Sequence, residues 1–260
     1  MTATLPRRAW VEQIMGLPVS IHLRGPGVGT ADAGARVAAC FAGLRRADAV
    51  FSPYRDDSDL SRWERGDLAV DAADPAFAEV LGLCDEARDR TGGWFDPRGL
   101  PDPRTGAPRF DPSGLVKGWA VERAARQLRQ LRGYSWCLNA GGDILLHAEP
   151  GHPAWRVGVE DPDDPARLLQ VLERRSGAVA TSGTARRGAH IIDPRTRRPA
   201  VAVRSVTVTG PDLLWADVYA TAAAARGPRS LPWLDTLDGY GALLVSASGL
   251  RQATTGWRVS

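Results

Sequence analysis

The sequence predicts an α+β fold in a single compact domain over residues 1–260, with mixed or antiparallel sheets and packed helices. Helix-period patterns dominate the first half, whereas the second half consists mainly of short strand-like runs joined by Gly, Pro and Asp turns. No internal repeat and no low-complexity linker marks a domain boundary. A chain of 260 residues can bury a substantial core, so we expect these elements to pack into one unit.

The first elements follow from apolar periodicity near the N-terminus. Apolar and polar residues alternate within residues 10–25, which predicts a strand. Thr30 then caps a helix that runs to about Val50, because apolar residues recur there every three or four positions. Residues 51–66 are polar, rich in turn formers and too irregular for a strand.

Two further helices are expected before the middle of the chain. Pro75 follows Asp74 at a favourable first helical position and opens a helix to about Arg90. Residues 91–112 form a loop rich in Gly, Pro and Asp. The next helix covers roughly residues 115–131, where apolar side chains again share one face.

The second half is expected to be mostly strand. One helix, from Leu214 to Ala225, interrupts the strands, and its run of alanines implies close packing against a neighbour. The expected strands lie within residues 134–148, 154–162, 168–183, 189–194, 202–211 and 241–249.

Composition excludes several classes of protein. Hydrophobic residues make up 43% and charged residues 24% of the chain, as in ordinary globular proteins. No stretch reaches the roughly 18 apolar residues of a membrane span, and no apolar signal segment follows the first arginines, so we expect a cytoplasmic protein without membrane insertion. The net charge of +3 is scattered, which predicts no nucleic-acid surface. Cys40, Cys84 and Cys137 lack paired spacing and are expected to be buried thiols.

One polar segment precedes the helix expected at residue 115. Asp111, Ser113 and Gly114 stand just before it, and Lys117 lies in its first turn. Main-chain N–H groups at a helix start, with a cation beside them, favour an anion such as phosphate. Lys117 is the single lysine among 33 basic residues, which indicates a site that needs a compact ammonium. An ordinary helix cap by Asp111 or Ser113 explains the segment equally well.

Two loops and one helix face carry further polar groups. Asn139 precedes a Gly pair that permits close approach of a ligand, although a plain hairpin turn is the simpler interpretation. Ser182, Arg186–Arg187 and His190 gather hydroxyl, cationic and imidazole groups within a few residues, although a lone histidine is more often structural.

Asp217 and Thr221 are four positions apart on the helix of the second half, so they share a face. A carboxylate and a hydroxyl there could both reach a hard cation such as Mg²⁺, which prefers oxygen ligands. The alternative is that the Thr221 hydroxyl bonds to its own helix while Asp217 faces water.

These segments, in this order, resemble the ApbE family of FAD:protein FMN transferases. The resemblance begins at Met15-Gly16 and extends to about residue 227, most of the chain. The matching motifs are GWFDP, DPSGLVKGWAVERA, LNAGGDI, WRVGVEDP, ATSG followed by HIIDP, and SVTVTGP followed by ADVYATA.

The resemblance implies an FAD cleft between two lobes and Mg²⁺-dependent transfer of FMN from FAD to a Thr or Ser hydroxyl of a partner flavoprotein, with release of AMP. It implies that Mg²⁺, or Mn²⁺ in its place, is held by Asp217, Thr221 and the main-chain carbonyl of Gly114. The residues implied to contact FAD are Met15, Tyr54, Trp94, Phe95, Asp96, Asp111, Lys117, Ser182, Gly183, His190 and Ile192.

Transfer to a hydroxyl benefits from a base that titrates near neutrality, which suits His190, although contact with the flavin ring is an alternative role. Two other functions stay open. Water could replace the acceptor, which gives an FAD pyrophosphatase, and a protein without turnover could bind FAD. Asp217, Thr221 and His190 argue against loss of turnover, but nothing in the sequence separates transferase from pyrophosphatase.

Overall fold

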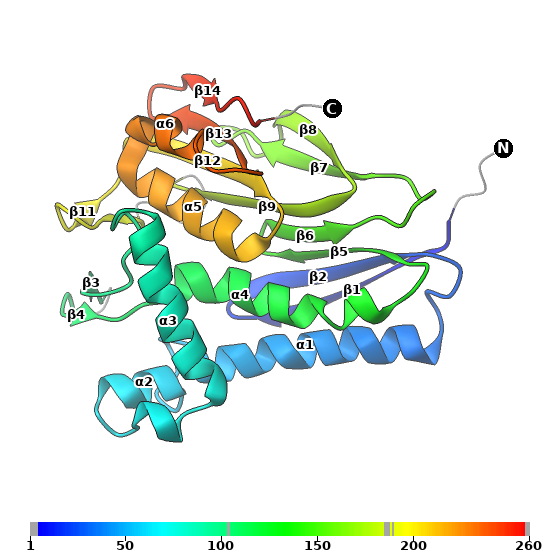
Figure 1. Ribbon diagram of the computed structural model, residues 1–260, viewed down its shortest axis with the longest axis horizontal. Helices are drawn as coiled ribbons and strands as arrows, with labels where there is room; N and C mark the ends of the chain where they lie inside the picture. Colours follow the sequence, from blue (N-terminus) through cyan, green and yellow to red (C-terminus); the bar gives the residue numbers. More distant parts are fainter. Residues whose placement is uncertain (1–4, 103–104, 185–187, 189, 258–260) are drawn as a thin grey trace.

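Eight antiparallel strands form the main sheet, and helices lie across one of its faces (Figure 1). The computed structural model describes residues 5–102, 105–184, 188 and 190–257. The strand order is β1-β2-β5-β6-β9-β12-β13-β14, and every paired strand of the described chain is antiparallel to its neighbour. The predicted α+β class is therefore confirmed, with antiparallel pairing.

The elements have the following bounds. The main sheet contains β1 (Arg7–Ile14), β2 (Leu17–Arg24), β5 (Ser135–Ala140), β6 (Asp143–His147), β9 (Ser176–Gly183), β12 (Val203–Gly210), β13 (Gly241–Ser246) and β14 (Arg251–Ala253). Three small hairpins pair β3 (Leu100–Pro101) with β4 (Pro108–Arg109), β7 (Trp155–Glu160) with β8 (Leu168–Arg174), and β10 (Ile192–Asp193) with β11 (Arg198–Pro199). The α-helices are α1 (Ala31–Phe51), α2 (Asp59–Glu64), α3 (Pro75–Arg90), α4 (Ser113–Ala125), α5 (Leu213–Arg226) and α6 (Leu231–Leu234).

The single strand predicted within residues 10–25 is wrong, because two strands and a tight turn occupy this region. Ile14 pairs with Leu17, so only Met15 and Gly16 connect β1 to β2. Their φ angles are 55° and 69°, the left-handed values that a two-residue hairpin turn requires. Gly16 is typical of such a turn, but Met15 at positive φ is not.

Local capping chemistry sets most helix starts. The Thr30 side chain accepts from the Ala33 N–H at 3.3 Å, and α3 begins at Pro75, both as predicted. The helix expected at residues 115–131 is wrong at both ends. It begins at Ser113 and stops at Ala125, and a 3₁₀ turn over Leu128–Gln130 follows.

The core has one part on each face of the sheet, because neighbouring residues of a strand point to opposite faces. Leu145 of β6 packs into the larger cluster beneath the helices, while the next residue, Leu146, joins a smaller cluster with the β7–β8 hairpin. The three cysteines are free and buried, as expected. Within the described ranges, no helix is long and apolar enough to cross a membrane.

Helices α4 and α5 pack closely on the sheet and position most of the polar groups discussed below. A Cβ added at Gly118 of α4 would lie 2.9 Å from the Leu213 carbonyl oxygen of α5. A Cβ at Gly114 would lie 3.8 Å from Thr221 Oγ1. Because the earlier glycine meets the later residue, the two helices run in opposite directions where they touch.

Candidate active site

A cavity of about 630 Å³ opens beside the α4–α5 contact and brings together segments that are far apart in the sequence. Every residue that the sequence analysis assigned to FAD or metal lines this one cavity. These residues are Met15, Tyr54, Trp94, Phe95, Asp96, Asp111, Gly114, Lys117, Ser182, Gly183, His190, Ile192, Asp217 and Thr221. Arg186 and Arg187 lie outside the described residues.

The predicted metal ligands meet between α4 and α5. Asp217 is fully buried, and Thr221 Oγ1 lies 3.0 Å from Ser182 Oγ at the end of β9. Gly114 lies in the first turn of α4, and a Cβ there would approach Phe95 to 3.2 Å. The alternative of a water-facing Asp217 and a Thr221 hydroxyl bonded only to its own helix is therefore wrong.

Lys117 lies between two carboxylates. It belongs to the second turn of α4, not the first as predicted, because the helix begins at Ser113. Its Nζ pairs with Asp143 Oδ2 and lies 3.4 Å from Asp217 Oδ2. One ammonium therefore meets two carboxylates in this buried cluster.

Asp143 is not among the site residues predicted from the sequence. This residue is 3% exposed, begins β6 after the Gly141–Gly142 turn, and accepts from the Thr181 N–H at 2.9 Å. Its place directly after the Gly pair of the LNAGGD segment was the available signal. The hairpin interpretation of that segment is confirmed, because Ala140 pairs with Asp143 and the Gly142 N–H donates to Asn139 at 2.8 Å.

The donor set fits a hard cation better than a transition metal. In the part of the chain that the structure describes, no three His, Cys, Asp or Glu side chains gather as a metal site. The site instead offers the Asp217 carboxylate, the Thr221 hydroxyl and the main chain at Gly114. Mg²⁺ commonly takes only one or two carboxylates from a protein and completes its shell with water and substrate phosphates.

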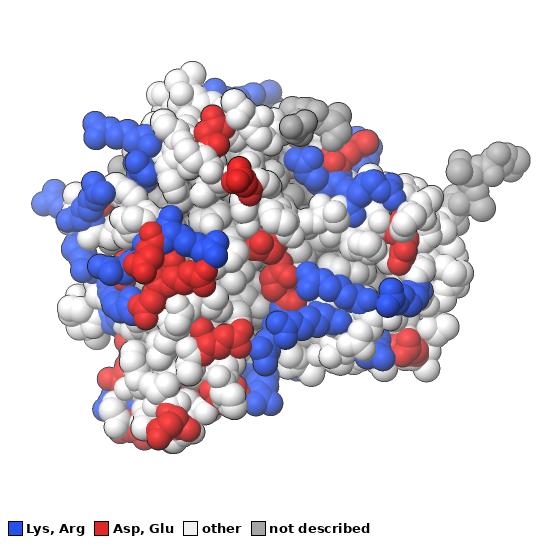
Figure 2. Space-filling view, viewed as in Figure 1, with Lys and Arg blue, Asp and Glu red and all other residues white. Residues whose placement is uncertain are grey.

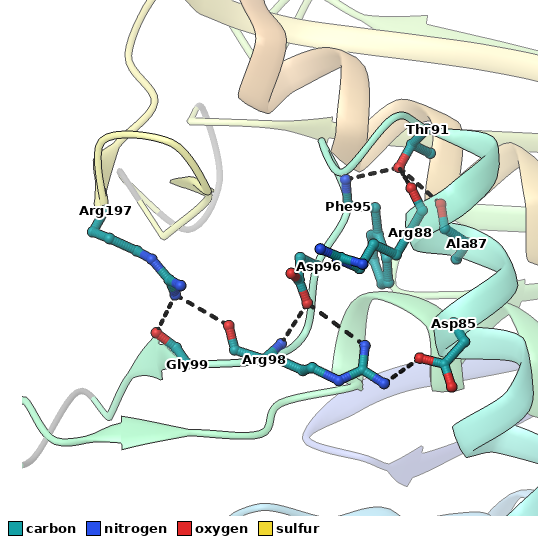
Figure 3. A network of polar contacts seen from close by, with 9 residues as sticks. All are labelled: Asp85, Ala87, Arg88, Thr91, Phe95, Asp96, Arg98, Gly99 and Arg197. Carbon is teal, nitrogen blue, oxygen red and sulfur yellow. Dashed lines mark hydrogen bonds and ion pairs between the residues drawn. The ribbon is translucent and has the colours of Figure 1, made fainter.

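The aromatic wall of the cavity is held by a buried threonine at the end of α3 (Figure 3). Thr91 is 2% exposed, and its hydroxyl donates to the Ala87 carbonyl at 2.8 Å and accepts from the Phe95 N–H at 3.0 Å. Asp96 then accepts from the Arg98 N–H and pairs with Arg88, with distances of 3.0 and 3.1 Å. These contacts fix the main chain that carries the cavity-lining residues 94–96.

An arginine joins this wall to the β10–β11 hairpin. Arg197 occupies the hairpin turn at φ 58°, and its guanidinium donates to the Arg98 carbonyl at 3.1 Å and the Gly99 carbonyl at 2.5 Å (Figure 3). Arg195 of the same turn lies 4.2 Å from the ring centre of Trp94. The strand that carries Ile192 is thereby held against the loop opposite it.

The remaining predicted residues lie toward the exposed part of the cavity. The Tyr54 side chain is 72% exposed. His190 is exposed, and its Nδ1 lies 3.0 Å from the Gly188 carbonyl. A proton on Nδ1 places the lone pair on Nε2, which is the tautomer a proton acceptor needs. Asp111 accepts from the Ser113 N–H at 3.0 Å, so it also serves the helix start.

Charged side chains are distributed over the molecule. On the face shown in Figure 2, basic and acidic side chains are interspersed. Asp161 also lines the cavity, and its carboxylate lies 3.5 Å from the Arg251 guanidinium.

Comparison with known sequences identifies relatives that match part of the chain. The model of the ApbE family matches residues 15–101 and 102–244. The FAD:protein FMN transferase of Rhodobacter capsulatus is 32% identical over 146 residues, which cover 53% of this chain and 28% of the relative. The transferase of Vibrio cholerae is 36% identical over 129 residues, which cover 45% of this chain and 38% of the relative. The chain thus spans less than half the length of these relatives.

Solved structures share the fold. The ApbE protein of Thermotoga maritima has a TM-score of 0.81 at 21% identity and covers 96% of this chain, with 97% of its own chain matched. The flavin transferase ApbE of Vibrio cholerae has a TM-score of 0.81 at 23% identity, with 97% and 98% covered. Because the family model matches most of the 260 residues and the fold agrees throughout, this chain belongs to the ApbE family.

Proposed function

We propose that this chain catalyses the Mg²⁺-dependent transfer of FMN from FAD to a Thr or Ser hydroxyl of a partner flavoprotein, with release of AMP. The activity named in its relatives supports the reaction type. One observation carries the proposal for this chain. Asp217 and Thr221 face Gly114 in a cavity that Trp94 and His190 also line, so oxygen ligands, an aromatic surface and a base share one space.

The Asp217 carboxylate, the Thr221 hydroxyl and the Gly114 carbonyl would hold Mg²⁺, or Mn²⁺ in its place. When bound, the ion supplies positive charge that stabilises the pyrophosphate oxygens as the bond between the phosphates breaks. The buried position of Asp217 keeps its carboxylate away from bulk water, which strengthens its interaction with a cation.

The transfer exchanges one P–O bond for another. The acceptor oxygen bonds to the phosphorus of the FMN half, the bond from that phosphorus to the bridging oxygen breaks, and AMP leaves with that oxygen. His190 Nε2 takes the proton of the acceptor hydroxyl, while the carbonyl of Gly188 orients the ring through Nδ1. A base in this role raises the rate by about 10²–10⁴-fold.

The flavin and the rest of FAD would be held by the residues around the cavity wall. The braced loop of Trp94, Phe95 and Asp96 presents aromatic and polar groups on one side. Met15 and Tyr54 line the cavity from the N-terminal part of the chain. The set that we assign to FAD is completed by Asp111, Lys117, Ser182, Gly183 and Ile192.

Mass spectrometry tests the proposal directly. The protein is incubated with FAD, Mg²⁺ and peptides that carry Thr or Ser, and we expect a peptide whose mass has increased by FMN minus water, together with AMP. Asp217→Asn should abolish this product, because it removes the charged ligand. Thr221→Val should reduce the product less, because it removes only one neutral ligand oxygen. His190→Ala should slow transfer at saturating FAD. The control His22→Ala removes an imidazole that lies outside the cavity lining, so it should leave the transfer rate unchanged.

Each other outcome identifies a different function. FMN and AMP without a modified peptide would indicate a pyrophosphatase, and tight FAD binding without any product would indicate a binding protein. Loss of FAD affinity in His190→Ala, with normal turnover at saturating FAD, would assign this residue to the flavin instead of the proton.

A further inference from the structure

Lys117 occupies a position that conflicts with the proposed cation. Its Nζ lies 3.4 Å from Asp217 Oδ2 and also pairs with Asp143. The side chains of Lys117, Asp143 and Asp217 are 18%, 4% and 0% exposed, so water screens their charges poorly. An ammonium and a divalent cation at the same carboxylate would repel each other strongly.

The contacts of Asp143 suit it to hold the Lys117 ammonium away from Asp217. It stands at the start of β6, within the main sheet, and its second oxygen accepts from the Thr181 N–H of β9 at 2.9 Å. Both strands belong to the main sheet, so the Asp143 carboxylate keeps its place. The Lys117 side chain has a flexible four-carbon stem and can move.

We propose that Asp143 is a positioning residue that retains the Lys117 ammonium when a divalent cation binds Asp217. Lys117 neutralises Asp217 before the cation arrives, gives up the Asp217 oxygen to it, and stays bound to Asp143. The inference rests on the proposed function in one respect, the assignment of Asp217 as a metal ligand. It predicts that Asp143 affects cation affinity mainly through Lys117.

A double-mutant cycle with Mn²⁺ tests the coupling in the 260-residue protein without FAD or acceptor. The electron paramagnetic resonance signal of free Mn²⁺ gives the Kd for the wild type, Asp143→Asn, Lys117→Met and the double variant. We expect Asp143→Asn to weaken Mn²⁺ binding roughly tenfold, since couplings between contacting residues commonly reach this size. In the Lys117→Met background the same change should alter the Kd less than about twofold.

Two further variants sharpen the test. Asp161→Asn removes the same charge from the cavity lining but from a carboxylate that faces Arg251, so it should leave the Kd nearly unchanged. Lys117→Arg should weaken Mn²⁺ binding even with Asp143 intact, because the guanidinium fork can hold both carboxylates at once. This second variant keeps the test decisive if Asp143→Asn fails to fold, which its circular dichroism spectrum would show.

Three results would overturn the inference. An equal loss of affinity in both backgrounds would mean that Asp143 acts on the cation directly, and an unchanged Kd in Asp143→Asn would mean that it does not act at all. If neither the wild type nor any variant binds Mn²⁺, no divalent cation competes with Lys117 for Asp217. The transfer assay decides the proposed function separately, because coupled Mn²⁺ binding without a modified peptide would refute only the transferase.

Discussion

Replacing Gly118 by alanine should disturb the contact between α4 and α5 on which the site depends. The added Cβ would lie 2.9 Å from both the Leu213 carbonyl oxygen and the Leu214 Cα, distances shorter than a methyl group tolerates. Both contacts are main-chain atoms, so no side chain can rotate away and the helices must separate. Overpacking of this kind costs about 1–3 kcal/mol of stability.

The same substitution also stabilises α4 through the higher helix propensity of alanine. A matched control in another helix measures this propensity effect so that it can be subtracted. Alanine is better than glycine in a helix interior by about 1 kcal/mol. Gly82 lies within α3, is exposed, and has no atom within 4 Å of an added Cβ. Gly82→Ala should therefore stabilise the protein, and the difference between the two variants isolates the overpacking cost of about 1–3 kcal/mol.

Urea unfolding followed by circular dichroism measures both free energies of unfolding. We expect Gly118→Ala to be less stable than Gly82→Ala by that difference and to bind Mn²⁺ more weakly than the wild type, because Gly114 and Thr221 move apart. Equal stabilisation of the two variants would refute the close approach of α4 and α5.

Three other perturbations have defined outcomes. Thr91→Val should cost about 1–3 kcal/mol in urea unfolding, because the buried Phe95 N–H loses its acceptor, and Thr91→Ser should recover most of the loss; equal stability of the two variants would contradict this role. Burial raises the pKa of each of the three cysteine thiols to about 12, so the folded protein should not react with a thiol reagent at neutral pH. The thiols of the unfolded chain have a pKa of about 8.5, so the free energy of unfolding should also fall as the pH rises from there toward 12. An unchanged urea midpoint over this range would contradict the expectation. Arg197→Gly keeps the left-handed turn but removes the guanidinium, so amide hydrogen exchange should accelerate around Gly99; unchanged exchange would show that the contact holds nothing.

Elements whose ends depend on local chemistry are the ones that the sequence predicts well. Thr30 and the Asp74–Pro75 pair satisfy main-chain N–H groups within their own segments, so α1 and α3 begin where these residues stand. The start of α4 is different, since Ser113 and Gly114 have no apolar side chain and the periodic pattern becomes visible only at Leu115.

Contacts between distant segments account for what the sequence does not reveal about the site. Lys117, His190 and Asp217 stand out in polar segments of the sequence, whereas residues such as Met15 and Trp94 are predicted only by the family resemblance. The partner of Lys117 could not be predicted, because Asp143 is far from it in sequence and comes near only through the position of β6 in the sheet. The segment around Lys117 is compatible with either a phosphate site or an ordinary helix cap, whereas the fold places two carboxylates beside the ammonium.

Spacing on α4 explains how the proposed cation site and the helix packing depend on each other. Gly114 and Gly118 are four positions apart and so share one face of the helix. Both face α5, the first at Thr221 and the second at Leu213. Lys117 lies between them in sequence, and its ammonium lies 3.4 Å from Asp217 Oδ2 of α5. A larger residue at Gly118, outside the cavity lining, should therefore act on the proposed cation site through the distance between the helices.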